Sequence, residues 1–120
     1  MAVPILAADG FGILVRNGML LLIGDNSRGV LYATYDFLQQ LGCRWLAPAF
    51  DYYKGAHEFV PQTPALSFRV SGDLIEKPDL KYRKLYVEAG WSHNTRNLLQ
   101  MIEWMPKCRF NTLVIPIDYQ

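Results

Sequence analysis

The feature that most constrains this chain is an amphipathic helix that has to end sharply at Gly42. Between residues 29 and 41 apolar side chains recur every three or four positions, which places them on one helix face, while Gln39 and Gln40 point away from it. A glycine directly after the last apolar position suits a left-handed C-cap, and Pro48 prevents an early restart. Such a helix must dock its apolar face against another element.

A β-hairpin is predicted immediately before this helix. Two apolar runs within residues 11–24 flank Asn17 and Gly18, a pair typical of a type I′ turn because both residues tolerate positive φ. The residues that could cap the following helix are Asp25, Asn26 and Ser27. The hairpin and the helix together predict a small α+β unit.

The second half of the chain has the pattern of one β-α-β step. A strand is predicted in the stretch LKYRKLYVE that starts at residue 80, and a nearly continuous apolar strand in NTLVIPIDY, as is typical of parallel sheets. Between them, residues 92–110 predict a helix that is capped by Ser92 or Asn94 and ended by Pro106. We expect the two strands to be parallel, with a right-handed crossover.

These patterns divide the chain into three parts. Residues 1–72 form the α+β piece, in which residues 65–70 alternate like a further strand; residues 73–79 form a linker, and residues 80–120 form the β-α-β segment. A single β-α-β step leaves sheet edges and one sheet face uncovered. We therefore expect a fragment of a larger protein, lacking its first elements, whose open sheet edges allow self-association.

Composition and charge exclude several partners. The net charge is +1 and the twelve Lys and Arg residues are scattered, which argues against a nucleic acid or a membrane surface as partner. No apolar run approaches the roughly 20 residues that a membrane-spanning helix needs. Three Trp, seven Tyr and six Phe residues supply enough bulk for a packed core.

The cysteines and histidines predict no metal site and no cofactor. Cys43 and Cys108 lie in unrelated contexts and are expected to be buried free thiols, with a disulfide as the alternative. His57 and His93 have no ligand spacing to each other or to either cysteine. Residues 24–29 have the outline of a phosphate loop but lack the Lys-Ser/Thr that would complete it.

The helix and its exit resemble the small α+β domain that precedes the catalytic barrel in several glycoside hydrolases. These are the family 20 β-hexosaminidases, the family 67 and 115 α-glucuronidases and uncharacterised bacterial relatives, of which the group with a Gly-Cys-Arg-Trp signature is the most similar. Their pattern is Gly-x-x-Tyr-Ala-x-x-x-Phe-Leu-x-x-Leu-Gly, followed by Arg-Trp-x-x-Pro. The matching residues are Gly29, Tyr32, Ala33, Phe37, Leu38, Leu41, Gly42, Arg44, Trp45 and Pro48.

The second half is similar to the opening of the family 20 barrel. The matching residues are Pro78, Tyr82, Arg83, Glu88, Asn111, Leu113, Asp118 and Gln120. The chain departs from that pattern at residues 88–92, which read Glu-Ala-Gly-Trp-Ser where the family continues into Asp-x-x-Arg-His. An N-acetylhexosamine substrate is therefore not assigned.

The resemblance implies a role as part of a carbohydrate-active enzyme. The chain would supply the non-catalytic accessory domain and the first β-α-β of a truncated (β/α)₈ barrel, in a bacterial-type parent hydrolase, extracellular or periplasmic, that cleaves O-glycosidic bonds. The family's catalytic pair follows a later strand, so no catalytic residue is predicted here and the chain alone should be inactive. Arg44 and Trp45 would brace the accessory domain against the barrel. The alternative is a free-standing carbohydrate-binding or protein-interaction module without catalysis.

Four residues are candidates for contacts with carbohydrate. By resemblance Arg83 would hold sugar hydroxyls, which suits a guanidinium fork, although an ion pair with Glu88 is the structural alternative. Glu88 and Asp118 follow adjacent parallel strands, at the end where barrel sites form, but either could instead cap a loop or helix. Trp91 offers an apolar face for a sugar ring, or simply packs.

Overall fold

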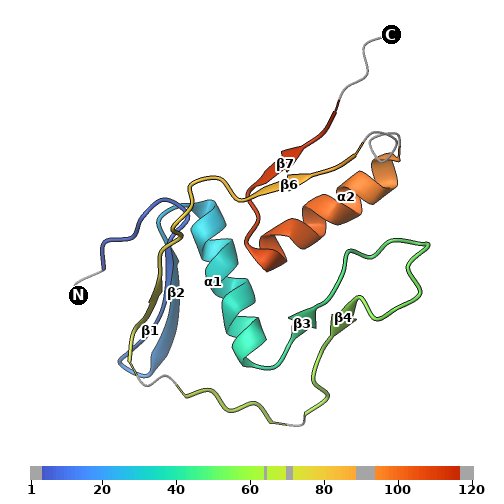
Figure 1. Cartoon of the computed structure of the whole chain (residues 1–120). Helices are drawn as coiled ribbons and strands as arrows, with labels where there is room; N and C mark the ends of the chain where they lie inside the picture. The colour runs from blue at the N-terminus through green and yellow to red at the C-terminus, as the bar shows by residue number, and fades with distance from the viewer. Residues whose placement is uncertain (1–3, 64, 70–71, 89–93, 117–120) are drawn as a thin grey trace. The chain divides into compact units, whose positions relative to one another are not determined.

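The computed structural model describes residues 4–63, 65–69, 72–88 and 94–116. Within these ranges the chain is a small α+β fold with two α-helices and several small sheets (Figure 1). It divides into two compact units: unit 1 comprises residues 1–43 and 60–81, and unit 2 comprises residues 44–59 and 82–120. The segment that follows the first helix therefore groups with the second half of the chain.

The sheet of unit 1 is built on the predicted hairpin. Its strands are β1 (Phe11–Arg16) and β2 (Met19–Gly24), which pair in antiparallel register. The turn residues Asn17 and Gly18 have φ values of 51° and 76°, the positive values that a type I′ turn requires. The third strand, β5 (Leu74–Glu76), pairs antiparallel with the other edge of β1. The hairpin prediction is confirmed.

The start of helix α1 (Ser27–Gln40) is held by a cluster of polar side chains. Asn26 is the N-cap, and its Oδ1 accepts a hydrogen bond from the Gly29 N–H at 2.9 Å. The Nδ2 of Asn26 and the Nε of Arg28 both donate to Oδ1 of Asp9 at 2.9 Å, and Asp9 is only 4% exposed. This buried carboxylate therefore ties the segment before β1 to the start of the helix.

The end of α1 has the predicted glycine cap. The N–H of Gly42 donates to the Gln39 carbonyl and the N–H of Cys43 to the Leu38 carbonyl, each at 3.0 Å, which is the Schellman pattern. Gly42 has a φ of 102°, a value that favours glycine. The sharp end expected from the sequence is confirmed, and its physical cause is this pair of hydrogen bonds.

The core of unit 1 lies between α1 and the sheet. Phe11 of β1 packs with Tyr32 and Ala33 of α1, and all three side chains are buried. Leu22 and Leu74, from the two flanking strands, extend this cluster. Each of the three strands thus supplies one apolar side chain to the cluster that packs against α1.

The predicted strand at residues 65–70 is wrong for the part that the structure describes. Residues 65–69 form no strand, and β5 instead lies inside the segment 73–79, for which the sequence predicts a linker. The ring of Phe68 packs edge-on against Phe37, with centroids 4.9 Å apart. Phe68 is therefore an apolar position because its ring packs against α1, and not because residues 65–69 pair in a sheet.

An ion pair joins β1 to the residue before β5. Both guanidinium nitrogens Nη1 and Nη2 of Arg16 donate to the Asp73 carboxylate, at 2.6 and 2.5 Å. These hydrogen bonds, with the charge of Arg16 adding less, hold the pKa of Asp73 below its usual value of 3.8. A lowered pKa stabilises the folded chain above pH 3.8, and this stabilisation is lost as the pH falls through the folded-state value.

Replacing Asp73 by asparagine should therefore have a pH-dependent effect. At neutral pH we expect the urea midpoint of Asp73→Asn to fall slightly, because an exposed ion pair contributes little. As the pH is lowered below 3.8, the difference from wild type should shrink, since the native carboxylate itself becomes protonated. Asp79→Asn, at another exposed carboxylate, is the matched control. A difference that stays unchanged as the pH is lowered contradicts the assignment.

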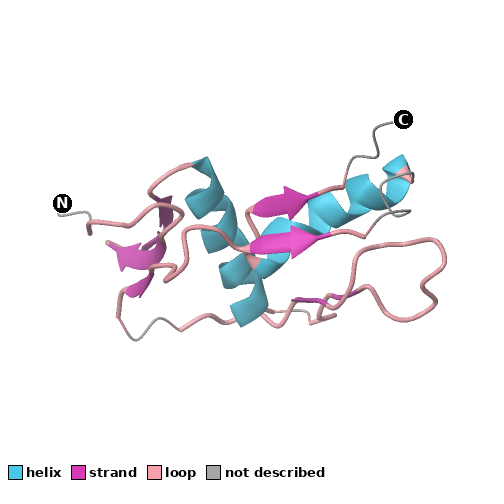
Figure 2. Cartoon of the chain, turned by 45° about the horizontal axis from the view of Figure 1, so that its top comes forward, coloured by secondary structure: helices cyan, strands magenta, loops and turns pink. Residues whose placement is uncertain are grey.

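Unit 2 contains the predicted β-α-β step. The strands β6 (Lys84–Tyr86) and β7 (Thr112–Val114) are parallel, with Leu85 opposite Leu113 (Figure 2). They are joined by helix α2 (Thr95–Trp104) and the 3₁₀ turn η2 (Met105–Cys108). Asn94 caps α2 through a 3.1 Å hydrogen bond from the N–H of Asn97 to its Oδ1. The strands are shorter than the sequence predicts, but their order and direction are confirmed.

A second, very short pair of strands completes unit 2. β3 (Arg44–Trp45) and β4 (Glu58–Phe59) are antiparallel and enclose a loop rich in aromatic residues. The His57 carbonyl accepts the N–H groups of Leu46 and Ala47 at 2.7 and 3.3 Å, which extends the pairing. We call residues 44–59 the β3–β4 arm.

Candidate functional site

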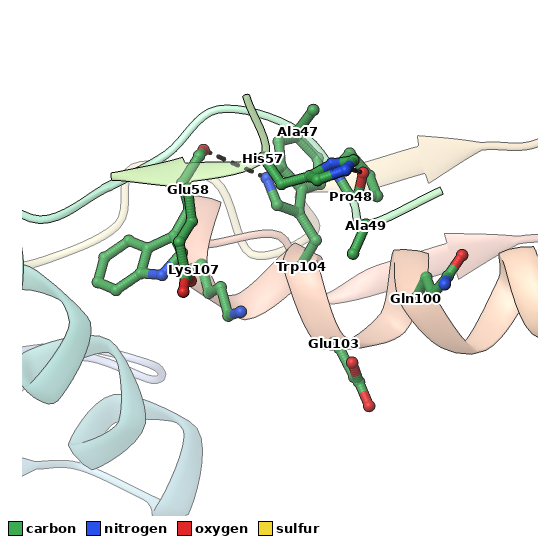
Figure 3. Close-up of a pocket in the computed structure, with 10 residues that line it drawn as sticks. Ala47, Pro48, Ala49, His57, Glu58, Gln100, Glu103, Trp104 and Lys107 are labelled. Atoms are coloured by element: carbon green, nitrogen blue, oxygen red, sulfur yellow. Dashed lines mark hydrogen bonds between the residues drawn. The ribbon is translucent and has the colours of Figure 1, made fainter. Parts of the chain in front are cut away.

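A cavity of about 420 Å³ lies in unit 2 between the β3–β4 arm and helix α2 (Figure 3). We call it the α2 cavity. The residues that line it are Trp45, Ala47, Pro48, Ala49, His57, Glu58, Gln100, Glu103, Trp104 and Lys107. Its volume falls in the lower part of the range of roughly 300–1,000 Å³ that small-molecule sites occupy.

The two tryptophans hold the arm and the helix together at this cavity. The indole Nε1 of Trp104 donates to the Trp45 carbonyl at 3.3 Å, as the dashed line in Figure 3 shows. The ring of Trp104 also packs against Phe110 at a centroid distance of 6.2 Å. The backbone of Trp45 is thus tied to the helix of the β-α-β step, while the neighbouring Arg44 is exposed. Bracing of an accessory domain by Arg44 and Trp45 stays a prediction.

His57 is held by two contacts in the arm. Its Nδ1 lies 3.0 Å from the Pro48 carbonyl oxygen, and its ring packs edge-on against Tyr53 at a centroid distance of 5.2 Å. Because a carbonyl oxygen only accepts hydrogen bonds, Nδ1 must carry the proton in this contact. In the neutral ring the other nitrogen, Nε2, is then an acceptor.

The polar side chains of the cavity include two carboxylates, one ammonium group and a glutamine amide. Glu58 and Glu103 are exposed carboxylates, Lys107 is half-buried, and in Figure 3 the Glu103 carboxylate projects away from His57. The Oε1 atom of Gln100 is buried and has no hydrogen-bond partner among the described residues. An acceptor buried in this way costs about 1–3 kcal/mol relative to a paired one, so its presence calls for an explanation.

Arg83 and Glu88 lie at opposite ends of β6. The Arg83 N–H donates to Oδ1 of Asn111 at 2.8 Å, and its Nε donates to the Arg109 carbonyl at 2.7 Å. These contacts hold the amino ends of β6 and β7 together. Glu88 follows the carboxyl end of β6, roughly 16 Å away for five extended residues. The two predicted residues are therefore not brought together, and no ion pair links them.

A smaller cavity lies at the carboxyl end of β6. Its volume is about 220 Å³, and its lining residues are Leu85, Tyr86, Val87, Glu88 and Met101. Glu88 is the single carboxylate in this lining and is exposed. The other two predicted contacts, Trp91 and Asp118, lie outside the described residues. Glu88 alone can therefore be placed at the end where the sequence predicts a site.

The cysteines play no part in either cavity. Both are free thiols: Cys43 is buried, whereas Cys108 is half-buried and not fully enclosed as the sequence predicts. Burial raises the pKa of the Cys108 thiol above 9.0, which keeps it protonated and a poor nucleophile at neutral pH. Over residues 4–63, 65–69, 72–88 and 94–116, no group of three or more His, Cys, Asp or Glu side chains could hold a metal ion.

Most of the α2 cavity has no signature in the sequence. His57 has no ligand spacing, and the position of Glu103 on a helix indicates only a solvated side chain. Gln100 is the lining residue that the sequence indicates least, because nothing in the sequence shows that its side-chain carbonyl oxygen is buried without a hydrogen-bond partner. The pair of tryptophans, Trp45 and Trp104, is the one available cue, since large aromatic residues often line binding sites.

Comparisons of the chain with protein-family models, with curated proteins and with solved structures find no match. The glycoside hydrolase resemblance therefore stays a prediction. In the described part of the chain no helix is long and apolar enough to cross a membrane.

Proposed function

We propose that this chain is the non-catalytic accessory domain and first β-α-β segment of an enzyme that hydrolyses O-glycosidic bonds. The observation that carries the proposal is the parallel pairing of β6 and β7 across α2. This is the repeating unit of a (β/α)₈ barrel, and it follows a hairpin and helix whose residues resemble the accessory domain. Glu88, after the carboxyl end of β6, is proposed to contact the sugar.

Exposed apolar side chains of unit 2 support this proposal. Leu99 and Ile102 on α2 are 57% and 50% exposed, and Tyr86 on β6 is 63% exposed. In a barrel, neighbouring strands and helices cover these positions. We propose a structural role for Arg83, which links the amino ends of β6 and β7. Active sites of barrels lie at the other end, where the strands finish.

The alternative is a free-standing binding module without catalysis. Exposed aromatic residues on the hairpin would favour it, but the hairpin's one aromatic residue, Phe11, is 2% exposed. Tyr52 and Tyr53 of the β3–β4 arm are exposed and keep a binding role open for unit 2.

A panel of aryl glycosides tests the proposal. We expect the 120-residue chain to show no turnover, and the protein encoded by the full reading frame to hydrolyse at least one glycoside. Turnover by the isolated chain contradicts the proposed non-catalytic role. A full reading frame that encodes no further barrel strands contradicts the proposed hydrolase and favours the alternative, a free-standing binding module.

A further inference from the structure

The α2 cavity combines aromatic side chains with one buried acceptor, Oε1 of Gln100, that has no hydrogen-bond partner in the described chain. Trp104 of α2 and His57 of the β3–β4 arm contribute aromatic rings to the lining, to which Trp45 also belongs. Aromatic faces of this kind pack well against the C–H face of a sugar ring, which is apolar, while the rim of the ring carries hydroxyl donors. A cavity for a purely apolar ligand would not need the polar groups described next.

Gln100 is the residue that indicates a ligand. Its Oε1 is buried without a partner in the described chain, although the side chain lines the cavity. The terminal torsion of glutamine is broad, so the amide can rotate to present Oε1 to a ligand in the cavity. A hydroxyl group there would supply the donor that this oxygen lacks.

The charges of the lining select the class of ligand. Glu58 and Glu103 outnumber Lys107, so the formal charge of these groups is negative, which disfavours a phosphate or carboxylate ligand. The neutral form of His57 has an acceptor at Nε2 when Nδ1 donates to the Pro48 carbonyl. A neutral polyhydroxylated ring, rich in donors, fits these acceptors best.

We propose that the α2 cavity is a non-catalytic binding site for one or two sugar residues of a neutral oligosaccharide. The site lies on the helix side of the β-α-β step and does not include Glu88, so it goes beyond the hydrolase proposed above. Sugar binding here needs neither catalysis nor further barrel strands. The two proposals can therefore fail separately.

Titration of the 120-residue chain with cellotetraose, xylotetraose and chitotetraose tests the site. The indole Nε1–H resonances of Trp45 and Trp104 should shift saturably with at least one of them, with a midpoint in the millimolar range or tighter. Tetraethylene glycol, which has oxygens and no ring face, should cause no saturable shift. Absence of saturable shifts with all three oligosaccharides overturns the proposal.

Substitution of Gln100 separates a binding role from a structural one. Gln100→Met preserves length and helix propensity but removes the orphaned oxygen, so the urea midpoint should rise while the dissociation constant increases about fivefold. Gln40→Met, on an exposed glutamine of α1, should leave oligosaccharide binding unchanged. Unchanged affinity in Gln100→Met overturns the role of this residue, and so does a lowered urea midpoint.

Discussion

Replacing Gly29 by alanine should lower the free energy of unfolding by at least about 3 kcal/mol. A Cβ atom at this position of α1 would lie 2.5 Å from the Gly10 carbonyl oxygen and 3.0 Å from the Cα of Gly24. Both neighbours are backbone atoms, so the helix would have to move away from the sheet. Alanine gains only about 1 kcal/mol in helix propensity over glycine, so the steric clash decides the sign.

Gly18→Ala is the matched control for this prediction. Gly18 has a φ of 76°, and no atom lies within 4 Å of the point that an added Cβ would occupy, so its substitution tests backbone strain without a clash. We expect a loss of about 1 kcal/mol at this position. Urea unfolding followed by far-ultraviolet circular dichroism measures both variants. If both variants lose the same free energy of unfolding, the prediction is wrong, because Gly29 would then not be needed for the close approach of α1 to β2.

Replacing Trp104 by alanine should clearly destabilise unit 2 and abolish its proposed ligand site. The substitution removes the hydrogen bond to the Trp45 carbonyl and the packing against Phe110. Because Trp104 is half-buried, we expect a loss of about 2–3 kcal/mol, below the roughly 3–5 kcal/mol of a fully buried aromatic residue. Oligosaccharide binding should disappear with the aromatic wall of the cavity.

Trp104→Phe distinguishes the packing from the hydrogen bond. Phenylalanine keeps an aromatic ring in contact with the arm and Phe110 but lacks the Nε1 donor, so we expect a loss of about 1 kcal/mol. Oligosaccharide binding should weaken but persist. If the alanine and phenylalanine variants lose the same stability, the aromatic surface contributes nothing and the stated role of Trp104 is wrong.

Local signals make unit 1 largely predictable from the sequence. The pair Asn17 and Gly18 specifies a turn by its φ requirements, and Gly42 specifies a helix end in the same way. The third strand escapes prediction because its pairing is non-local. Leu74 lies in a strand because it pairs with Ile13 of β1. The residues around Phe68 also alternate between apolar and polar, but among the described residues they pair with no strand.

The α2 cavity is much less predictable, for a physical reason. It forms where the β3–β4 arm meets α2, so its residues are brought together by tertiary contacts and not by any spacing in the sequence. The unpaired oxygen of Gln100 is a property of packing alone. Conversely, the family motif suggests that Arg83 contacts substrate, but the motif does not show at which end of β6 its side chain makes contacts.

A single nuclear magnetic resonance sample tests the central claim most directly, that this chain takes part in carbohydrate recognition without cleaving carbohydrate. The 120-residue chain is mixed with the oligosaccharide that gives the largest response, and indole and anomeric proton signals are followed together. We predict shifted Trp45 and Trp104 indole signals with anomeric signals that stay constant over days. Unshifted indole signals, or new anomeric signals from a shortened sugar, would contradict it.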